Sequence, residues 1–293
     1  MTYQLYIGNR LYFSWSIAAY LMFEKFGLSA QVKTTVLRPE TESDVRRLLA
    51  EHNLGHARTL PTAVTPEGAI LNDSMAIAEE LASRHPEVDF WPSAPVARAT
   101  ARALANEMHS SFGGLRGNWP VNLRVSNVSQ TPPPEIEAEL ERLEVLWTHA
   151  RTVTNSQTPW LCGEYSLVDA IFAPMAARLA GYDFHTRPTT KAYVDAHLAD
   201  PALRRWRAMG LANEPHLAKF EINAPEAPWR GPTSRAAALV DNGPSENTLC
   251  PYSALPVTHF MEMNGRIFGF CNAFCRDKTM HDPEAWPKFM ALV

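Results

Sequence analysis

The sequence predicts an α/β domain, then an all-helical domain, then a small module built from a β-hairpin and a helix. Three observations lead to this fold class. Residues 1–86 alternate between strand and helix patterns, residues 95–220 are helical in pattern, and residues 248–293 hold three of the four cysteines. These ranges are the expected domain boundaries, and residues 221–247 are expected to connect the last two domains.

In the α/β domain, two hydrophobic periods distinguish strands from helices. The expected order is strand, helix, strand, helix, strand, strand, helix, at residues 3–7, 15–26, 31–37, 41–52, 61–64, 69–71 and 74–84. The first three elements form a βαβ unit, so their two strands should be parallel. Gly27 is expected to end the first helix, and Thr41 with Asp44 to cap the start of the second.

Short sequence signals also predict where helices begin in the second domain. Three prolines at residues 132–134 interrupt the helical pattern and precede a charged amphipathic helix at residues 135–151. Ser166 followed by Asp169 predicts a buried capping box, whose loss should cost about 1–2 kcal/mol or more. Residues 222–247 carry four prolines and two glycines, so this connector is expected to be poorly structured.

The composition argues against several classes of protein. Hydrophobic residues are 46% and charged residues 20%, as in ordinary folded soluble proteins. A net charge of -4 gives no basic surface for a nucleic acid or an anionic membrane. The sequence has no run of about 18 apolar residues, and its first residues lack a signal-peptide pattern. With only four cysteines, a reducing compartment is expected. We therefore expect a cytoplasmic protein with no nucleic-acid or membrane partner.

A candidate thiol site lies where the first strand meets the first helix. Tyr12, Ser14 and Ser16 place hydroxyls near a helix N-terminus, which carries unpaired N–H groups and about half a positive charge. A thiolate held there would have a pKa below its usual value of about 8.5. Ser14 or Ser16 could instead serve only as a helix cap.

Two more segments suit an extended, anionic ligand. Leu60 and Pro61 precede a strand, where a cis peptide bond would turn the backbone and leave Leu60 able to pair with a peptide. Asp73 and Ser74 open the third helix, whose N-terminus suits a carboxylate.

The order and spacing of these three segments resemble the thioredoxin-like N-terminal domain of cytosolic glutathione transferases. Residues 12–16 are similar to the serine-bearing, zeta-like bacterial branch of that family. The resemblance implies an enzyme that activates the thiol of its co-substrate glutathione for attack on a small electrophilic molecule. It assigns Ser14 as the activating hydroxyl, with Ser16 and Tyr12 as rivals. The residues that it assigns to glutathione binding are Leu60, Pro61, Asp73 and Ser74, and the glycine carboxylate is left to His52, His56 or Arg58.

The second domain resembles the all-α domain of the same family, on residues 107–122 and on the capping box. The resemblance implies an electrophile pocket, assigned to Met108, His109, Phe112 and Arg116. Interdomain core is the alternative for the apolar members, which would lie on one stripe of a helix. The resemblance also implies a homodimer.

Two other functions stay open. A glutathione-dependent isomerase of the maleylacetoacetate type would use the same thiolate, and a non-catalytic glutathione-binding or regulatory protein could keep the fold. An oxidoreductase that uses its own cysteine is disfavoured, because no cysteine precedes Cys162.

The C-terminal module resembles a YHS-type module, a zinc-ribbon-like hairpin followed by a helix. Asn264 and Gly265 predict a hairpin turn between strands at residues 258–263 and 266–270. A module of this size has too small a core to be secure alone, so it needs a metal or a partner surface.

Three cysteines of this module are candidate zinc ligands. Cys271 and Cys275 are four residues apart, as on one face of a helix, and Cys250 would add a third thiolate. Ser253 stands where a fourth cysteine would be expected. The fourth ligand is left to His259, His281, Asp282 or water, and a metal-free module of buried thiols is the alternative.

Overall fold

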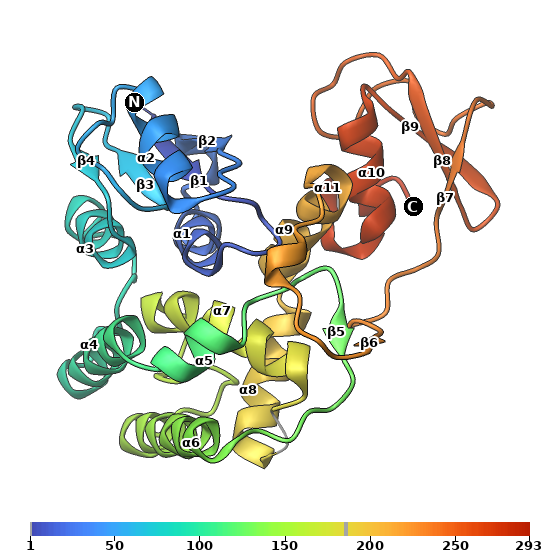
Figure 1. The fold of residues 1–293 in the computed structure, drawn as a ribbon. Helices are drawn as coiled ribbons and strands as arrows, with labels where there is room; N and C mark the ends of the chain where they lie inside the picture. Colours follow the sequence, from blue (N-terminus) through green and yellow to red (C-terminus); the bar gives the residue numbers. More distant parts are fainter. Residues whose placement is uncertain (1, 185–186) are drawn as a thin grey trace. The chain divides into compact units, whose positions relative to one another are not determined.

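The computed structural model describes residues 2–184 and 187–293, and it divides into two compact units (Figure 1). The first unit holds the chain up to Leu198 together with Leu217–Arg230, and the second holds Ala199–His216 together with Gly231–Val293. The units therefore cut across the predicted boundaries, because residues 199–216 of the expected helical domain associate with the C-terminal module.

The first half of unit one is a four-stranded sheet with three long helices. Strand order is β2-β1-β3-β4; β1 and β2 are parallel, as predicted, and β3 is antiparallel to both β1 and β4. The elements are β1 (Tyr3–Ile7), α1 (Ser14–Glu24), the short 3-10 helix η1 (Ser29–Gln31), β2 (Val32–Val36), α2 (Glu42–Glu51), β3 (Thr62–Val64), β4 (Ile70–Leu71) and α3 (Ser74–Arg84).

Side chains along β1 alternate between the two faces of the sheet, and both faces are covered. Tyr3 packs against Phe23 of α1 on one side, with ring centroids 5.4 Å apart. Tyr6 packs on the other side against the apolar cluster around Leu49 of α2. Gly27 takes a φ of 75°, so it ends the first helical segment as predicted.

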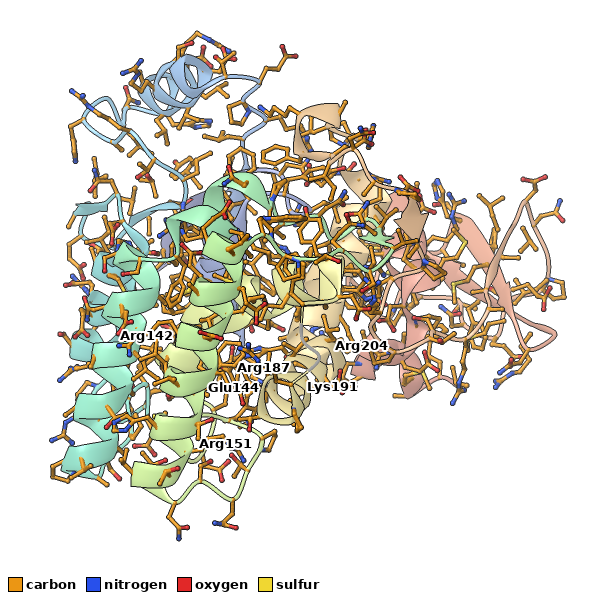
Figure 2. All side chains as sticks on the ribbon, turned by 60° about the horizontal axis from the view of Figure 1, so that its bottom comes forward. Arg142, Glu144, Arg151, Arg187, Lys191 and Arg204 are labelled. Carbon is orange, nitrogen blue, oxygen red and sulfur yellow. The ribbon has the colours of Figure 1, made fainter. Side chains whose placement is uncertain are left out.

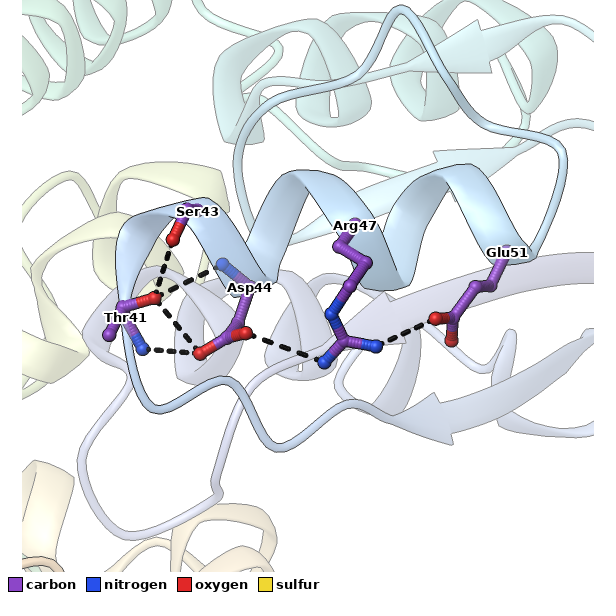
Figure 3. Close-up of polar contacts among 5 residues, drawn as sticks. All are labelled: Thr41, Ser43, Asp44, Arg47 and Glu51. Atoms are coloured by element: carbon purple, nitrogen blue, oxygen red, sulfur yellow. Dashed lines mark hydrogen bonds and ion pairs between the residues drawn. The ribbon is translucent and has the colours of Figure 1, made fainter.

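The predicted capping box of α2 is present. The Thr41 hydroxyl accepts from the Asp44 amide at 3.2 Å, and the Asp44 carboxylate accepts from the Thr41 amide at 3.0 Å (Figure 3). Arg47 then pairs with Glu51 one turn later at 2.7 Å. The start of α2 is thus fixed by hydrogen bonds within the segment that the sequence identified.

The second half of unit one is helical. Its helices are α4 (Pro95–Ser110), α5 (Gly113–Asn118), α6 (Pro134–Thr154), α7 (Leu167–Tyr182) and α8 (Pro188–Ala199). Every residue of α7 is buried, and α7 packs against both α1 and α4. Its N-terminus carries the predicted capping box, in which the buried Asp169 carboxylate accepts from the Ser166 amide at 2.9 Å.

One helical prediction is wrong. Residues 107–122 do not form a single helix, because Phe112 adopts a left-handed conformation with φ 60° between α4 and α5. Met108, Phe112 and Leu115 therefore do not lie along one face of a single helix, although all three side chains are buried.

An ion pair and a hydrogen bond join α6 to the start of α8. Arg187, just before α8, pairs with Glu137 of α6 at 2.5 Å, and Thr190 of α8 donates to Glu144 of α6. Figure 2 shows Arg142, Glu144 and Arg151 along α6, with Arg187 and Lys191 nearby.

After helix α9 (Pro201–Asn213), the chain returns to unit one at Leu217. Within it, the 3-10 helix η2 (Ala218–Phe220) places Phe220 on Tyr12 in a stacked contact of 5.0 Å between ring centroids. Strand β6 (Glu226–Ala227) pairs with β5 (Ser126–Asn127). The predicted connector is thus partly structured.

Unit two contains α9 (Pro201–Asn213), β7 (Ala238–Val240), β8 (His259–Met263), β9 (Arg266–Phe270), α10 (Ala273–His281), the short η3 (Pro283–Ala285) and α11 (Pro287–Met290). The predicted hairpin forms between β8 and β9, and Asn264 and Gly265 both have positive φ, as a type I′ turn requires. Residues of the predicted connector add β7 to the edge of this hairpin. Helix α9 packs on α10, and Arg204 of α9 binds Asp282 through two hydrogen bonds of 2.8 and 2.6 Å.

In the described part of the chain, none of the helices combines the length and the apolar character needed to cross a bilayer.

Candidate functional site

Ser14 is the first residue of α1, at the end that carries unpaired amides. Within the described part of the chain, neither its hydroxyl nor the amides of Ser14 and Trp15 make a hydrogen bond. Phe13 precedes the helix and offers no side-chain cap. Three donors therefore remain available at a helix N-terminus, where a negative charge is stabilised.

The two rival hydroxyls are engaged elsewhere. Ser16 is fully buried, and its oxygen accepts from the Gly8 amide at 3.1 Å. Tyr12 is buried under Phe220, and its oxygen accepts from the Leu217 amide at 3.5 Å. Each holds a neighbouring backbone segment in place, so Ser14 is the hydroxyl of the three that can face a ligand.

A cavity of about 220 Å³, called cavity A, lies beside this helix start. Its lining contains all four residues predicted to bind glutathione: Leu60, Pro61, Asp73 and Ser74. The other lining residues are Trp15, Thr59, His109 and Arg116. Cavity A thus brings together four separate segments of the chain: Trp15, residues 59–61, residues 73–74, and the segment that carries His109 and Arg116.

The Leu60 backbone in cavity A is available to a ligand. The Leu60–Pro61 peptide bond is cis. Within the described residues, neither the amide nor the carbonyl of Leu60 makes a hydrogen bond. The Thr59 hydroxyl donates to the Asn72 carbonyl, which ties this turn to the segment that carries Asp73.

Asp73 has two roles in cavity A. One carboxylate oxygen caps α3 by accepting from the amides of Met75 and Ala76, at 2.7 and 3.3 Å. The other oxygen lies 2.9 Å from the His109 ring. This pairing was not predictable from local patterns, because the two residues are 36 positions apart. His109 therefore belongs to cavity A, beside Asp73 and Ser74, which the resemblance assigns to glutathione binding.

A larger cavity of about 490 Å³, called cavity B, shares Trp15 and Arg116 with cavity A and also includes Ser14. Its lining has two guanidinium groups, Arg116 and Arg178, and no carboxylate. Burial lowers the pKa of Arg116 and brings that of Arg178 to about 10, which leaves both cationic at neutral pH. Cavity B is therefore suited to an anionic group near Ser14.

Arg116 is held firmly between the two cavities. Its Nη1 donates to the carbonyls of His109 and Ser111 at 2.8 and 3.1 Å. Its guanidinium carbon lies 4.9 Å from the centroid of the Trp15 ring, a cation–π distance. Trp15 directly follows Ser14 in the sequence, so it could have been predicted as a residue of this site.

The remaining predicted pocket residues lie elsewhere. Met108 and Phe112 are buried and line neither cavity. Their burial matches the alternative of a core position. His52, His56 and Arg58 are exposed and line neither cavity, so neither cavity selects one of them for the glycine carboxylate.

Unit two brings the three predicted metal ligands together. The sulfur atoms of Cys250, Cys271 and Cys275 all lie within 4.8 Å of one another. Cys271 does not belong to the helix, which corrects the expected helical face, because Asn272 caps α10 and the helix begins at Ala273. Burial raises the pKa of Cys250, but hydrogen bonding from the backbone amides of Cys271, Tyr252 and Ser253 outweighs it and brings the pKa to about 7. Burial raises the pKa of Cys275 to about 12.

No protein-family model matches the sequence. Over 166 residues the chain is 26% identical to the stringent starvation protein A homolog of Coxiella burnetii, an alignment that covers 55% of this chain and 75% of that protein.

Solved structures of glutathione transferases share the fold. A glutathione transferase homolog from Burkholderia, with bound glutathione, superposes on 72% of this chain and 98% of its own, with a TM-score of 0.51 and 20% identity. Human glutathione transferase theta-2, in complex with glutathione and an unknown ligand, gives a TM-score of 0.51 over 76% and 93% of the two chains, at 21% identity. At these identities the likeness establishes the fold: a thioredoxin-like domain followed by an all-helical domain.

Proposed function

We propose that this chain, which has the fold of the glutathione transferases, binds glutathione in cavity A and presents its thiolate at Ser14 to an electrophile in cavity B. One observation carries the proposal. The residues assigned by resemblance to glutathione binding line one cavity, and the hydroxyl assigned to the thiol lines the adjoining one. The two cavities share Trp15 and Arg116, so a tripeptide in one can reach the other.

The chemistry follows from the charges around Ser14. Glutathione loses its thiol proton to solvent, and the thiolate accepts hydrogen bonds from the Ser14 hydroxyl and the free amides of α1. The guanidinium groups of Arg116 and Arg178 add favourable potential. The sulfur then forms a bond to an electrophilic carbon, and a leaving group departs or the carbon skeleton takes up a proton. An isomerase would use the same thiolate, which adds and later leaves.

A second candidate is a non-catalytic glutathione-binding or regulatory protein. The sequence relative is named as a stringent starvation protein A homolog and not as a transferase, which favours keeping this candidate. The two functions separate in a conjugation assay with and without glutathione. Saturable glutathione binding without thiol transfer to any of a panel of electrophiles would favour the second.

Asp73→Asn is expected to raise the KM for glutathione by about tenfold or more, with a smaller change in kcat. The carboxylate would attract the ammonium of the γ-glutamyl group, and the amide keeps the oxygen that caps α3 but loses the charge. Steady-state kinetics with varied glutathione, and calorimetry with glutathione alone, measure the effect.

Asp200→Asn is the matched control. Asp200 caps α9 through the same pattern of amides, Ala202 at 2.8 Å and Leu203 at 3.4 Å, but lines neither cavity. Equal glutathione affinity in the parent, Asp73→Asn and Asp200→Asn would remove Asp73 from the glutathione site.

We also propose a homodimer, on the resemblance and on the exposed valines of two packed helices, Val96 on α4 and Val145 and Val153 on α6. Sedimentation at micromolar concentration is expected to show a species of twice the chain mass of 32.7 kDa. A single species at the mass of one chain would contradict the proposal.

A further inference from the structure

The cysteine cluster of unit two is built from three separately fixed segments. Cys250 sits in a tight turn, where its amide donates to the Leu255 carbonyl at 2.8 Å and its carbonyl accepts from the Ala254 amide at 2.9 Å. Cys271 follows β9, and its carbonyl accepts from the Thr258 hydroxyl at 3.0 Å. Cys275 lies in the first turn of α10, where its amide donates to the Asn272 cap at 2.8 Å.

The sulfur separations suit a tetrahedral metal. With Zn–S bonds of about 2.3 Å, tetrahedral geometry places the sulfur atoms about 3.8 Å apart. The sulfurs of Cys271 and Cys275 are 3.9 Å apart, and no pair of the three exceeds 4.8 Å. The sulfur atoms would need to move together by about 1 Å at most to reach this geometry. Thiolate ligands select soft or borderline metals, of which zinc is one.

The surroundings also suit a complex with one net negative charge. Three thiolates around a divalent ion leave a charge of minus one. Lys278, one turn along α10 from Cys275, is buried with its ammonium 3.9 Å from the centroid of Tyr252 and 4.2 Å from that of Trp286. A buried cation beside the cluster would neutralise the complex.

The fourth corner of the cluster faces solvent. Cys250 and Cys275 are buried, whereas Ser253 is exposed, and its hydroxyl lies 3.1 Å from the Cys271 sulfur. A Ser253 hydroxyl is a weaker ligand for zinc than a thiolate. The open side therefore suits an exchangeable donor such as water.

We propose that Cys250, Cys271 and Cys275 bind one zinc ion, with an exchangeable water at the fourth position beside Ser253. The site belongs to unit two and is independent of the proposed glutathione chemistry. Its role is structural: it would join the turn, the hairpin and α10 of a small core whose largest buried side chains include Phe268, Phe270 and Phe289.

The test uses the full-length protein purified without chelator, then supplied with Zn2+ alone. Elemental analysis is expected to give one zinc per chain in the parent and less than about a tenth of that in Cys271→Ser. Cys162→Ala is the matched control, because Cys162 is the remaining cysteine and lies in unit one. With Co2+ in place of zinc, the parent should show thiolate-to-cobalt charge-transfer absorption that Cys271→Ser lacks.

Ser253→Cys tests the proposal independently, even if the cysteine variants misfold. This exposed position would supply a fourth thiolate, so zinc affinity should rise by about tenfold or more in a chelator competition. Unchanged affinity in Ser253→Cys, or equal zinc in the parent and Cys271→Ser, would overturn the proposal. One copper or iron per chain, bound in preference to zinc, would overturn the assignment to zinc.

Discussion

Ser14→Ala is expected to lower kcat/KM for thiol conjugation by about 10²-fold at neutral pH, the usual cost of one donor aimed at a reacting anion. The hydroxyl is without a partner in the described part of the chain and lines cavity B at the start of α1. Its removal takes one hydrogen bond from the thiolate, so the pKa of bound glutathione should rise. The free amides of α1 remain, and they should preserve part of the activity.

The pH dependence of kcat/KM measures this prediction, together with ultraviolet titration of the bound thiol. The parent should reach its plateau at a lower pH than Ser14→Ala. Ser43→Ala is the matched control: Ser43 lies in the first turn of α2, bonded to Thr41, and lines neither cavity (Figure 3). If Ser14→Ala is fully active and Ser16→Ala or Tyr12→Phe is inactive, another hydroxyl than that of Ser14 activates the thiol.

Asp169→Ala is expected to lower the free energy of unfolding by about 3–5 kcal/mol. The carboxylate is fully buried and accepts four hydrogen bonds. They come from the amides of Leu161 and Ser166 at 3.1 and 2.9 Å, from the Tyr193 hydroxyl at 2.9 Å and from the Ser166 hydroxyl at 3.5 Å. Alanine would leave these four buried donors without this acceptor. The loss exceeds that of an exposed cap because water cannot replace the carboxylate.

Urea denaturation at pH 7.5 measures the change. Burial raises the pKa of Asp169 to about 6, so at this pH the carboxylate is ionised in both the folded and unfolded chains. Asp195→Ala is the matched control, since Asp195 pairs with Lys191 on the exposed side of α8 at 2.5 Å, and it should cost less than about 0.5 kcal/mol. Equal costs for the two variants would contradict the structural role of Asp169.

Features fixed by neighbouring residues were predictable from the sequence. The capping boxes at Thr41 and Ser166 depend on two residues three positions apart, and the hairpin turn at Asn264 and Gly265 depends on their tolerance of positive φ. The candidate site has a similar local basis. The four residues that the resemblance assigned to glutathione binding come from two short segments, and all four line cavity A.

Features that depend on tertiary contacts were not predictable. An aromatic residue rarely adopts positive φ, so the left-handed conformation of Phe112 between α4 and α5 was not predictable, although Gly113 and Gly114 directly after it are typical of a break in a helix. The cap at Asn272 is a local feature by contrast, and it could have been recognised: its bond to the Cys275 amide starts α10 at Ala273 and excludes Cys271 from the helix. The pairing of Asp73 with His109 requires α3 and α4 to lie side by side, and the hydrophobic periodicity of a sequence does not predict which helices do so.

Helix α7 has no side that faces water, since all of its residues are buried, Arg178 included. A surface helix has one face on which substitutions are nearly neutral, but α7 has none, and each change of volume must be absorbed by a neighbour. One of those neighbours is α1, whose first residue is Ser14. A change of volume at positions 167–182 is therefore passed on to the helix that begins at Ser14, and within α7 it is Arg178 that lines cavity B.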